Sequence, residues 1–300
     1  MRVVVFLVLG GLLLSSRARS QPLSAGKHEV TVSQARKILP DAPASCADIP
    51  CMLEATYAKD PKAKALALAI FADNGSVVGV GPDEIMDGGY RGKIHLVPEL
   101  PQGKYRKHLE AVSFATKSID EFFTKLFDKQ AAPNYRWRGI QLRFVRSVGK
   151  RTPSAYAIGW LFAYNVEGSL MQTQLGARET YFHELFHSND NDWSGKALRK
   201  DYDAIVKKCP GVTVKCLAPY APNDTVVRGG TYYAFQQNNG DGVHEYAAEL
   251  AVRYWEEHLE ILAKGKLATR PFKCGAPENG RSWKALIDQF FGGRDLTPPC

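Results

Sequence analysis

The chain lacks several features that define well-known classes of protein. Beyond its first twenty residues it has no long apolar run, so integral membrane association is not expected. The formal net charge is +8, or +5 without the three arginines of those first residues, and the basic residues are scattered. No basic stripe interleaved with aromatic residues exists, so nucleic acid is not an expected partner. Internal repeats and low-complexity runs are also absent.

The first twenty residues have the pattern of an export signal. Arg2 supplies a positive start, an apolar run follows from Val3 to Leu14, and Ala18-Arg19-Ser20 is a plausible cleavage site, with Ser16-Arg17-Ala18 as the alternative. The run is too short to span a membrane, and no cysteine follows it closely enough for a bacterial lipid anchor. We expect residues 1–20 to be a signal peptide, and the mature chain to be soluble and secreted, either extracellular or periplasmic.

The six cysteines all follow this leader, and their even number indicates disulfides formed in an oxidising compartment. Proximity along the chain favours three pairs. They are Cys46–Cys51, Cys209–Cys216 and Cys274–Cys300. Ligation of zinc by cysteine is the rival interpretation, but the chain contains no C-x-x-C.

Two tripeptides match the N-glycosylation sequon, Asn74-Gly75-Ser76 and Asn223-Asp224-Thr225. In a host that glycosylates secreted proteins each is a potential acceptor. Otherwise each is simply a turn.

Residues 21–104 read as a separate section, either an N-terminal subdomain or a propeptide. A helical stretch is expected near residues 52–57. The apolar run 65–72, followed by a turn and by residues 77–80, predicts either a hairpin or a helix, a turn and a strand. Glycine and proline are frequent from residue 79 to residue 103, which indicates loops.

Residues 105–300 are expected to form the main domain. Apolar residues recur at helical spacing over residues 108–129, and strands are expected over 137–148 and 155–164. A helix that carries the motif described below comes next, followed by a loop-rich segment around Cys209 and Cys216. A long helix over 241–264 and a short one over 283–291 complete the chain. This order of helices and strands predicts an α+β fold.

The most specific motif is His183-Glu184-Leu185-Phe186-His187, an HExxH pentapeptide. Residues four apart lie on one face of a helix, so His183 and His187 can aim imidazole nitrogens at one point. Two histidines placed in this way suit a tetrahedral Zn²⁺. Glu184 can reach a metal-activated water and accept its proton. A solvated helical turn is the plainer interpretation, but the surrounding aromatic and aliphatic residues argue against it.

Through this pentapeptide the chain resembles the zincin metallopeptidases. The resemblance implies that His183 and His187 are metal ligands and that Glu184 is the general base. It also implies a zincin-like catalytic domain, in which the active-site helix lies beside a small mixed sheet and a later helix carries another ligand. The edge strand of that sheet would hold an extended peptide.

A catalytic zinc site needs a third protein ligand and leaves its fourth position open. The metzincin pattern would place histidine at position 193, which is Trp193 here. Glu245-Tyr246-Ala247-Ala248-Glu249 is similar to the glutamate helix of lethal-factor-like peptidases. That similarity implies that Glu245 is the third ligand and that Glu249 accepts a hydrogen bond from a ligand histidine. His244, Asp241, or no protein ligand at all are the alternatives.

Glutamate-liganded zincins usually add a tyrosine or a histidine that stabilises the oxyanion. Tyr233 is the candidate for this catalytic role, with Tyr232 beside it, although paired tyrosines more often pack in a core. Asp190 could support a ligand histidine, but a role in capping or in a turn is the plainer interpretation.

These residues predict a secreted, zinc-dependent endopeptidase that hydrolyses protein or peptide substrates as a monomer. The first alternative is an exported binding or toxin-like protein whose metal site is structural or vestigial. A second alternative keeps the hydrolytic metal but changes the substrate to an amide in cell-wall material. The strands expected between residues 137 and 164 favour peptides, because extended substrates pair with strand edges.

Overall fold

A computed structural model describes residues 29–88, 91–128, 133–227, 229–237 and 240–300. The expected signal peptide, residues 1–20, lies outside the described residues. Within the described part of the chain, no helix combines the length and the apolar character needed to cross a membrane.

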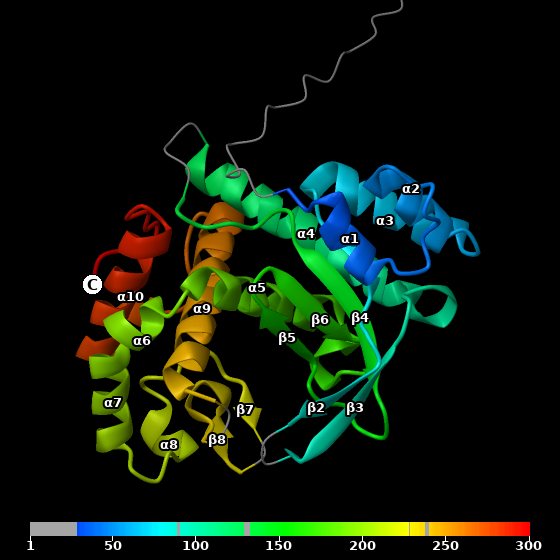
Figure 1. The fold of residues 1–300 in the computed structure, drawn as a ribbon. Helices are drawn as coiled ribbons and strands as arrows, with labels where there is room; N and C mark the ends of the chain where they lie inside the picture. The colour runs from blue at the N-terminus through cyan, green and yellow to red at the C-terminus, as the bar shows by residue number, and fades with distance from the viewer. Residues whose placement is uncertain (1–28, 89–90, 129–132, 228, 238–239) are drawn as a thin grey trace, which may run out of the picture.

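The fold is mixed α+β and is organised around one curled sheet (Figure 1). The strands of the sheet are β1 (Val77–Val80), β2 (Glu84–Asp87), β3 (Lys93–Pro98), β4 (Gln141–Ser147), β5 (Ala155–Ile158) and β6 (Leu161–Asn165). The order across the sheet is β2-β3-β4-β6-β5, and β1 pairs with β4 in parallel beside this path. β4 and β6 are also parallel, whereas β5 runs antiparallel to β6 and forms an edge. A two-stranded sheet, β7 (Val226–Val227) and β8 (Thr231–Tyr232), lies apart from it.

Helices before the sheet cover one end of the molecule (Figure 1, blue). They are α1 (Val32–Ile38), α2 (Ile49–Thr56) and α3 (Pro61–Asn74). The first turn of each of these helices is capped by a side chain. At the start of α3, for example, the Asp60 carboxylate accepts from the backbone N–H of Ala63 at 3.0 Å. α3 ends at Gly75, whose φ of 70° is left-handed. Of the two predictions for residues 65–80, the helix, turn and strand is therefore right.

Two sequence predictions about strands were wrong. Residues 79–103, expected to be loops, contain β2 and β3, because Ile94 and Leu96 alternate as buried positions between polar residues. Residues 155–164, expected to be one strand, form the β5–β6 hairpin. Gly159, with a φ of 57°, turns the chain at its tip. The expected strand over 137–148 is shorter and begins at Gln141.

The section before residue 105 contributes β1, β2 and β3 to the same sheet as β4. Its buried residues also belong to the same hydrophobic core as those of the later helices. Whether this section is a removable propeptide stays a prediction.

Three long helices pack on one another. They are α4 (Arg106–Phe127), α5 (Gln174–Asp190) and α9 (Gly242–Lys264), and α5 also packs on β5. Aromatic rings fill the space between them: the rings of Phe182 and Trp255 stack with centroids 4.9 Å apart, and the ring of Phe123 stacks on Trp137 at 4.3 Å. The helix expected over 108–129 ends at Phe127, and Lys129 lies outside the described residues.

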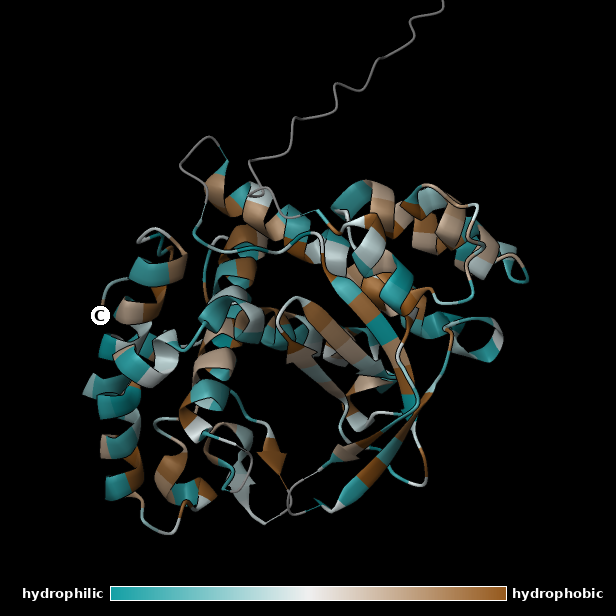
Figure 2. Cartoon of the chain, in the orientation of Figure 1, coloured by the Kyte–Doolittle hydropathy of each residue, from teal (hydrophilic) through white to brown (hydrophobic). Residues whose placement is uncertain are grey.

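The expected loop-rich segment after α5 is partly helical. Its helices are α6 (Trp193–Ala197), α7 (Arg199–Lys208) and α8 (Val214–Leu217). α7 and the later α10 (Pro277–Phe290) lie on the side of the molecule opposite α1 to α3 (Figure 1). Figure 2 shows mainly hydrophilic residues along α7 and hydrophobic residues concentrated on the strands of the main sheet. Short 3-10 turns are η2 (Gly103–Tyr105), η3 (Ser169–Gln172), η4 (Tyr233–Phe235) and η5 (Phe272–Cys274).

All three expected disulfides are present, Cys46–Cys51, Cys209–Cys216 and Cys274–Cys300. The first sequon is not an accessible acceptor: Asn74 is buried at the end of α3, and its amide nitrogen donates to the carbonyl of Trp137 at 3.4 Å. This tripeptide is the turn that the sequence offered as the alternative.

Candidate metal centre

Helix α5 carries the HExxH residues and is held rigidly by the core. The Thr173 side chain caps its start by accepting from the backbone N–H of Gly176 at 3.0 Å. Phe182, Leu185 and Phe186 are fully buried, so one side of the helix is fixed against the core. His183 and His187 lie on another side, one turn apart, and their rings are 4.7 Å apart.

The first turn of α9 brings a carboxylate to these two imidazoles. Asp241 caps the helix, and Glu245 follows one turn later. His183 Nε2 lies 3.0 Å from His187 Nε2 and 3.2 Å from Glu245 Oε2, and His187 Nε2 lies 3.6 Å from the same oxygen. Tetrahedral zinc with bonds of about 2.0–2.1 Å separates its ligand atoms by about 3.3 Å. The three atoms are therefore close enough together to hold one metal ion.

Among the residues that the structure describes, one group of three histidine, cysteine or carboxylate side chains is close enough together to hold a metal ion. It consists of His183, His187 and Glu245. The alternatives for the third ligand point elsewhere. Asp241 pairs with Arg199, and the imidazole of His244 contacts Asp190 and Ser194. Of the candidates on this helix, Glu245 is the one that the fold brings to the two histidines.

Glu249, one turn after Glu245, lies behind the metal site. His183 Nδ1 donates to Glu249 Oε1 at 2.9 Å. A proton held on Nδ1 leaves the lone pair of Nε2 for a metal. The hydrogen bond that was expected between Glu249 and one of the two histidines is therefore present.

The charges of the site suit a cation. Burial raises the pKa of Glu245, but hydrogen bonds with His183 and His187 outweigh burial, and the pKa falls well below its usual range. Burial lowers the pKa of His183, but the carboxylates of Glu245 and Glu249 outweigh burial, and the pKa rises. Glu245 is thus ionised, which is the form that binds metals.

Glu184 is nearly enclosed, with 7% of its surface exposed. Burial raises the pKa of Glu184, while the neighbouring His183 and His187 oppose this rise. The backbone N–H of Ala157, on the edge strand β5, donates a hydrogen bond to its carboxylate. A carboxylate with a raised pKa is better suited to accept and return a proton near neutral pH.

Ala157 shows how β5 faces the site, which no sequence pattern indicated. The carbonyl of Ser154, the residue before β5, accepts from the N–H of Asn165 in β6. In an antiparallel pair every second residue makes such bonds, so Tyr156 and Ile158 also face β6. Ala155 and Ala157 fall between these positions, and their backbone groups point away from β6. The side chains of His187 and Glu245 are 23% and 16% exposed, so the site is open to solvent.

Tyr233 lies beside the site at the start of η4, and its ring centroid is 5.7 Å from that of His183. Asp190 does not contact a ligand histidine. It accepts instead from the backbone N–H of Ser194 at 2.7 Å and from His244 Nδ1 at 2.7 Å, so it joins α5 to α6 and α9.

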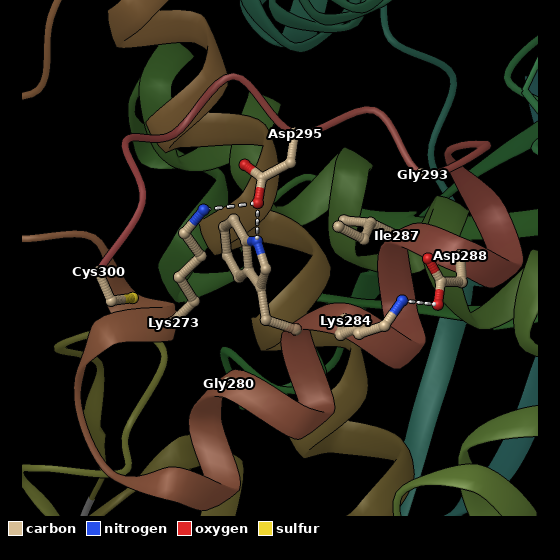
Figure 3. Close-up of a pocket in the computed structure, with 9 residues that line it drawn as sticks. Lys273, Gly280, Lys284, Ile287, Asp288, Gly293, Asp295 and Cys300 are labelled. Atoms are coloured by element: carbon tan, nitrogen blue, oxygen red, sulfur yellow. Dashed lines mark hydrogen bonds and ion pairs between the residues drawn. The ribbon is translucent and has the colours of Figure 1, made fainter.

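A separate hollow of about 370 Å³ lies at the C-terminal end of the chain and contains none of these residues. Figure 3 shows Lys273 in contact with Asp295 there. The indole N–H of Trp283 donates to the same carboxylate at 3.1 Å. This hollow belongs to the packing of α10.

Comparison of the chain with protein-family models, with curated proteins and with solved structures finds no match in any of the three.

Proposed function

We propose that the protein is a secreted, zinc-dependent endopeptidase of the zincin type. The observation that carries the proposal is the triangle of His183 Nε2, His187 Nε2 and Glu245 Oε2, with sides of 3.0–3.6 Å. Two imidazoles and one carboxylate are the donor set of many catalytic zinc sites, in which one position remains for water or substrate. A structural zinc site usually has four protein ligands, whereas the described residues here supply three.

His183, His187 and Glu245 would hold the zinc ion, which supplies a Lewis acid that polarises the scissile carbonyl and lowers the pKa of water. Glu184 accepts the proton of the attacking water and passes it to the leaving amine. Its burial supports this role, because the raised pKa brings proton acceptance and release closer together in energy. The N–H of Ala157 fixes the orientation of the carboxylate.

An extended peptide would align along β5. The outward N–H and carbonyl of Ala155 and the outward carbonyl of Ala157 can pair with a substrate strand, as peptides pair with exposed sheet edges in other proteins. The N–H of Ala157 is already bonded to Glu184. Tyr233, whose ring lies beside that of His183, would donate a hydrogen bond to the oxyanion that forms at the carbonyl.

Secretion is part of the proposal. Three disulfides are compatible with an oxidising compartment, and the leader pattern of residues 1–20 directs a chain there. A monomer is proposed because the chain by itself supplies every residue of the site.

The test measures the zinc content of the purified mature protein and its cleavage of a diverse peptide library. We expect one zinc ion per chain, and we expect Glu184→Gln to retain zinc while losing about 10²- to 10⁴-fold in hydrolysis. Glu54→Gln, at an exposed position of α2, is the matched control and should match wild type. Glu245→Ala should lose zinc.

A wild-type protein that binds no zinc would refute the proposal. Zinc binding without cleavage of any peptide would favour the exported binding protein with a structural or vestigial site. Cleavage of cell-wall amides in place of peptides would keep the chemistry and change the substrate.

A further inference from the structure

The second sequon places its asparagine against the metal centre. Asn223 lies in the segment between α8 and β7, and its amide nitrogen donates to Glu249 Oε2 at 3.0 Å and to the Glu249 carbonyl at 3.2 Å. Glu249 Oε1 in turn accepts from His183 Nδ1 at 2.9 Å. One side chain, 26 residues before Glu249 in the sequence, therefore reaches the metal ligand through a single carboxylate.

These contacts hold both oxygens of the carboxylate. Glu249 is 8% exposed, and a buried carboxylate requires donors for its oxygens. Among the described residues Glu249 forms an ion pair with His183, and the carboxyl groups of Glu179 and Glu256 lie nearby. The amide donor satisfies Oε2, which leaves Oε1 to accept from the imidazole of His183.

The second contact ties Asn223 to the helix itself. By donating to the carbonyl of Glu249 as well as to its side chain, the amide fixes the carboxylate relative to the α9 backbone. Glu245 is on the same helix, one turn earlier. The orientation of His183 and the position of Glu245 are thereby set by one element.

We propose that Asn223 is a positioning residue of the metal centre, which acts on zinc through Glu249 and His183. The inference rests on the proposed function, because it requires that zinc binds here. Loss of the amide would free the carboxylate to rotate, and the imidazole of His183 would no longer be held with Nε2 toward the ion. Changes of such outer partners typically weaken metal binding by about 10- to 100-fold.

The experiment is a double-mutant cycle on zinc affinity, measured by chelator competition with the full mature chain. We expect Asn223→Ala to weaken zinc binding by about 10- to 100-fold in the wild-type background. In a Glu249→Ala background the same substitution should have less than about a threefold effect, because the group through which it acts is gone. Equal effects in both backgrounds would overturn the proposal.

Two further variants separate positioning from folding. Asn223→Asp keeps the shape but places an oxygen against Glu249, so it should weaken zinc binding at least as much as Asn223→Ala. Thr225→Ala alters the same exposed segment and removes the sequon without touching Glu249, so it should bind zinc as wild type does. The absorption spectrum of bound Co²⁺ should change in the Asn223 variants and not in Thr225→Ala.

The outcomes distinguish the two proposals. A wild-type protein without zinc affinity refutes the proposed function. Zinc affinity in the wild type, with the same affinity and the same Co²⁺ spectrum in Asn223→Ala and Asn223→Asp, refutes the role of Asn223 alone.

Discussion

His244 donates from Nδ1 to Asp190 at 2.7 Å, and this contact joins the last turn of α5 to the first turn of α9. Asp190 is 4% exposed and also accepts from Ser194. The contact thus locks together the two helices that carry the proposed zinc ligands, at the residue that precedes Glu245.

This relationship predicts the effect of His244→Ala. The substitution leaves a buried carboxylate with one partner fewer, so we expect the free energy of unfolding to fall by about 1–3 kcal/mol. Urea denaturation of the metal-free protein measures it. His95→Ala is the control, because His95 pairs with Asp83 at 2.8 Å but both side chains are exposed, at 42% and 64%. That change should cost less than about 1 kcal/mol, and equal losses in the two variants would contradict the argument.

Phe182 precedes His183, the first of the two proposed ligand histidines, and anchors it to the core. Its ring is fully buried and stacks on Trp255 with a 10° angle between the planes. Phe182→Ala should lower the free energy of unfolding by about 3–5 kcal/mol through lost burial and the cavity left behind. Leu175→Ala, on the same helix but 53% exposed, should change it by less than about 0.5 kcal/mol. Urea denaturation measures both variants. Similar denaturation midpoints would show that the packing of Phe182 does not hold α5 in place.

Asp295 should make the protein sensitive to acid. Burial raises the pKa of Asp295, but hydrogen bonds from His258, Lys273 and Thr297 outweigh burial, and the pKa lies far below its usual range. A carboxyl with a lowered folded-state pKa stabilises the protein above its unfolded pKa of about 3.9 and loses that contribution as the pH falls further.

We therefore expect wild type to lose more stability than Asp295→Asn between about pH 5 and about pH 2, measured by denaturation at each pH. Asp288→Asn, which removes an exposed carboxylate from α10, is the control and should follow wild type. A parallel decline of wild type and Asp295→Asn would rule out this role for Asp295.

Glu256 should make the protein less stable at high pH, the opposite of the effect of Asp295. Burial, and then the charge of Glu179, raise the pKa of Glu256 to about 7. A buried carboxyl with a raised folded-state pKa destabilises the fold when it is ionised. The free energy of unfolding therefore falls as the pH rises from about 4.5 through about 7.

Glu256→Gln should consequently be more stable than wild type at pH 8 and about equal to it at pH 4. Thermal unfolding at the two pH values measures this difference. Glu260→Gln, one turn later on α9, is the control: Lys264 lowers the pKa of Glu260, so this variant should show no such gain at pH 8. A Glu256→Gln variant that is no more stable than wild type at pH 8 would refute the expectation.

Much of the architecture could be predicted from the sequence, because the signals are local. The 3.6-residue spacing of apolar side chains predicted α4 and α9 to within two residues at most ends. Proximity of the cysteines along the chain predicted all three disulfides. The i, i+4 spacing of His183 and His187 already required both imidazoles to share one face of a helix.

Other features could not be predicted, because they depend on residues far apart in the chain. On a helical wheel Glu245 falls on the face expected to be solvated, and His244 falls nearer the apolar side. Only the packing of α9 on α5 decided that Glu245 meets the histidines while His244 turns to Asp190. The contact of Ala157 with Glu184 likewise requires the β5–β6 hairpin to lie along α5.

The sequence by itself determined which groups are available for chemistry and the one helical turn that holds two of them. The tertiary structure alone decided their partners: Glu245 for the two imidazoles, Glu249 behind His183, and Asn223 behind Glu249. The physical reason is how far apart the interacting residues lie along the chain. Helical spacing is set by backbone geometry within a few residues, whereas these contacts join segments 26–66 residues apart, which only the burial of a common core brings together.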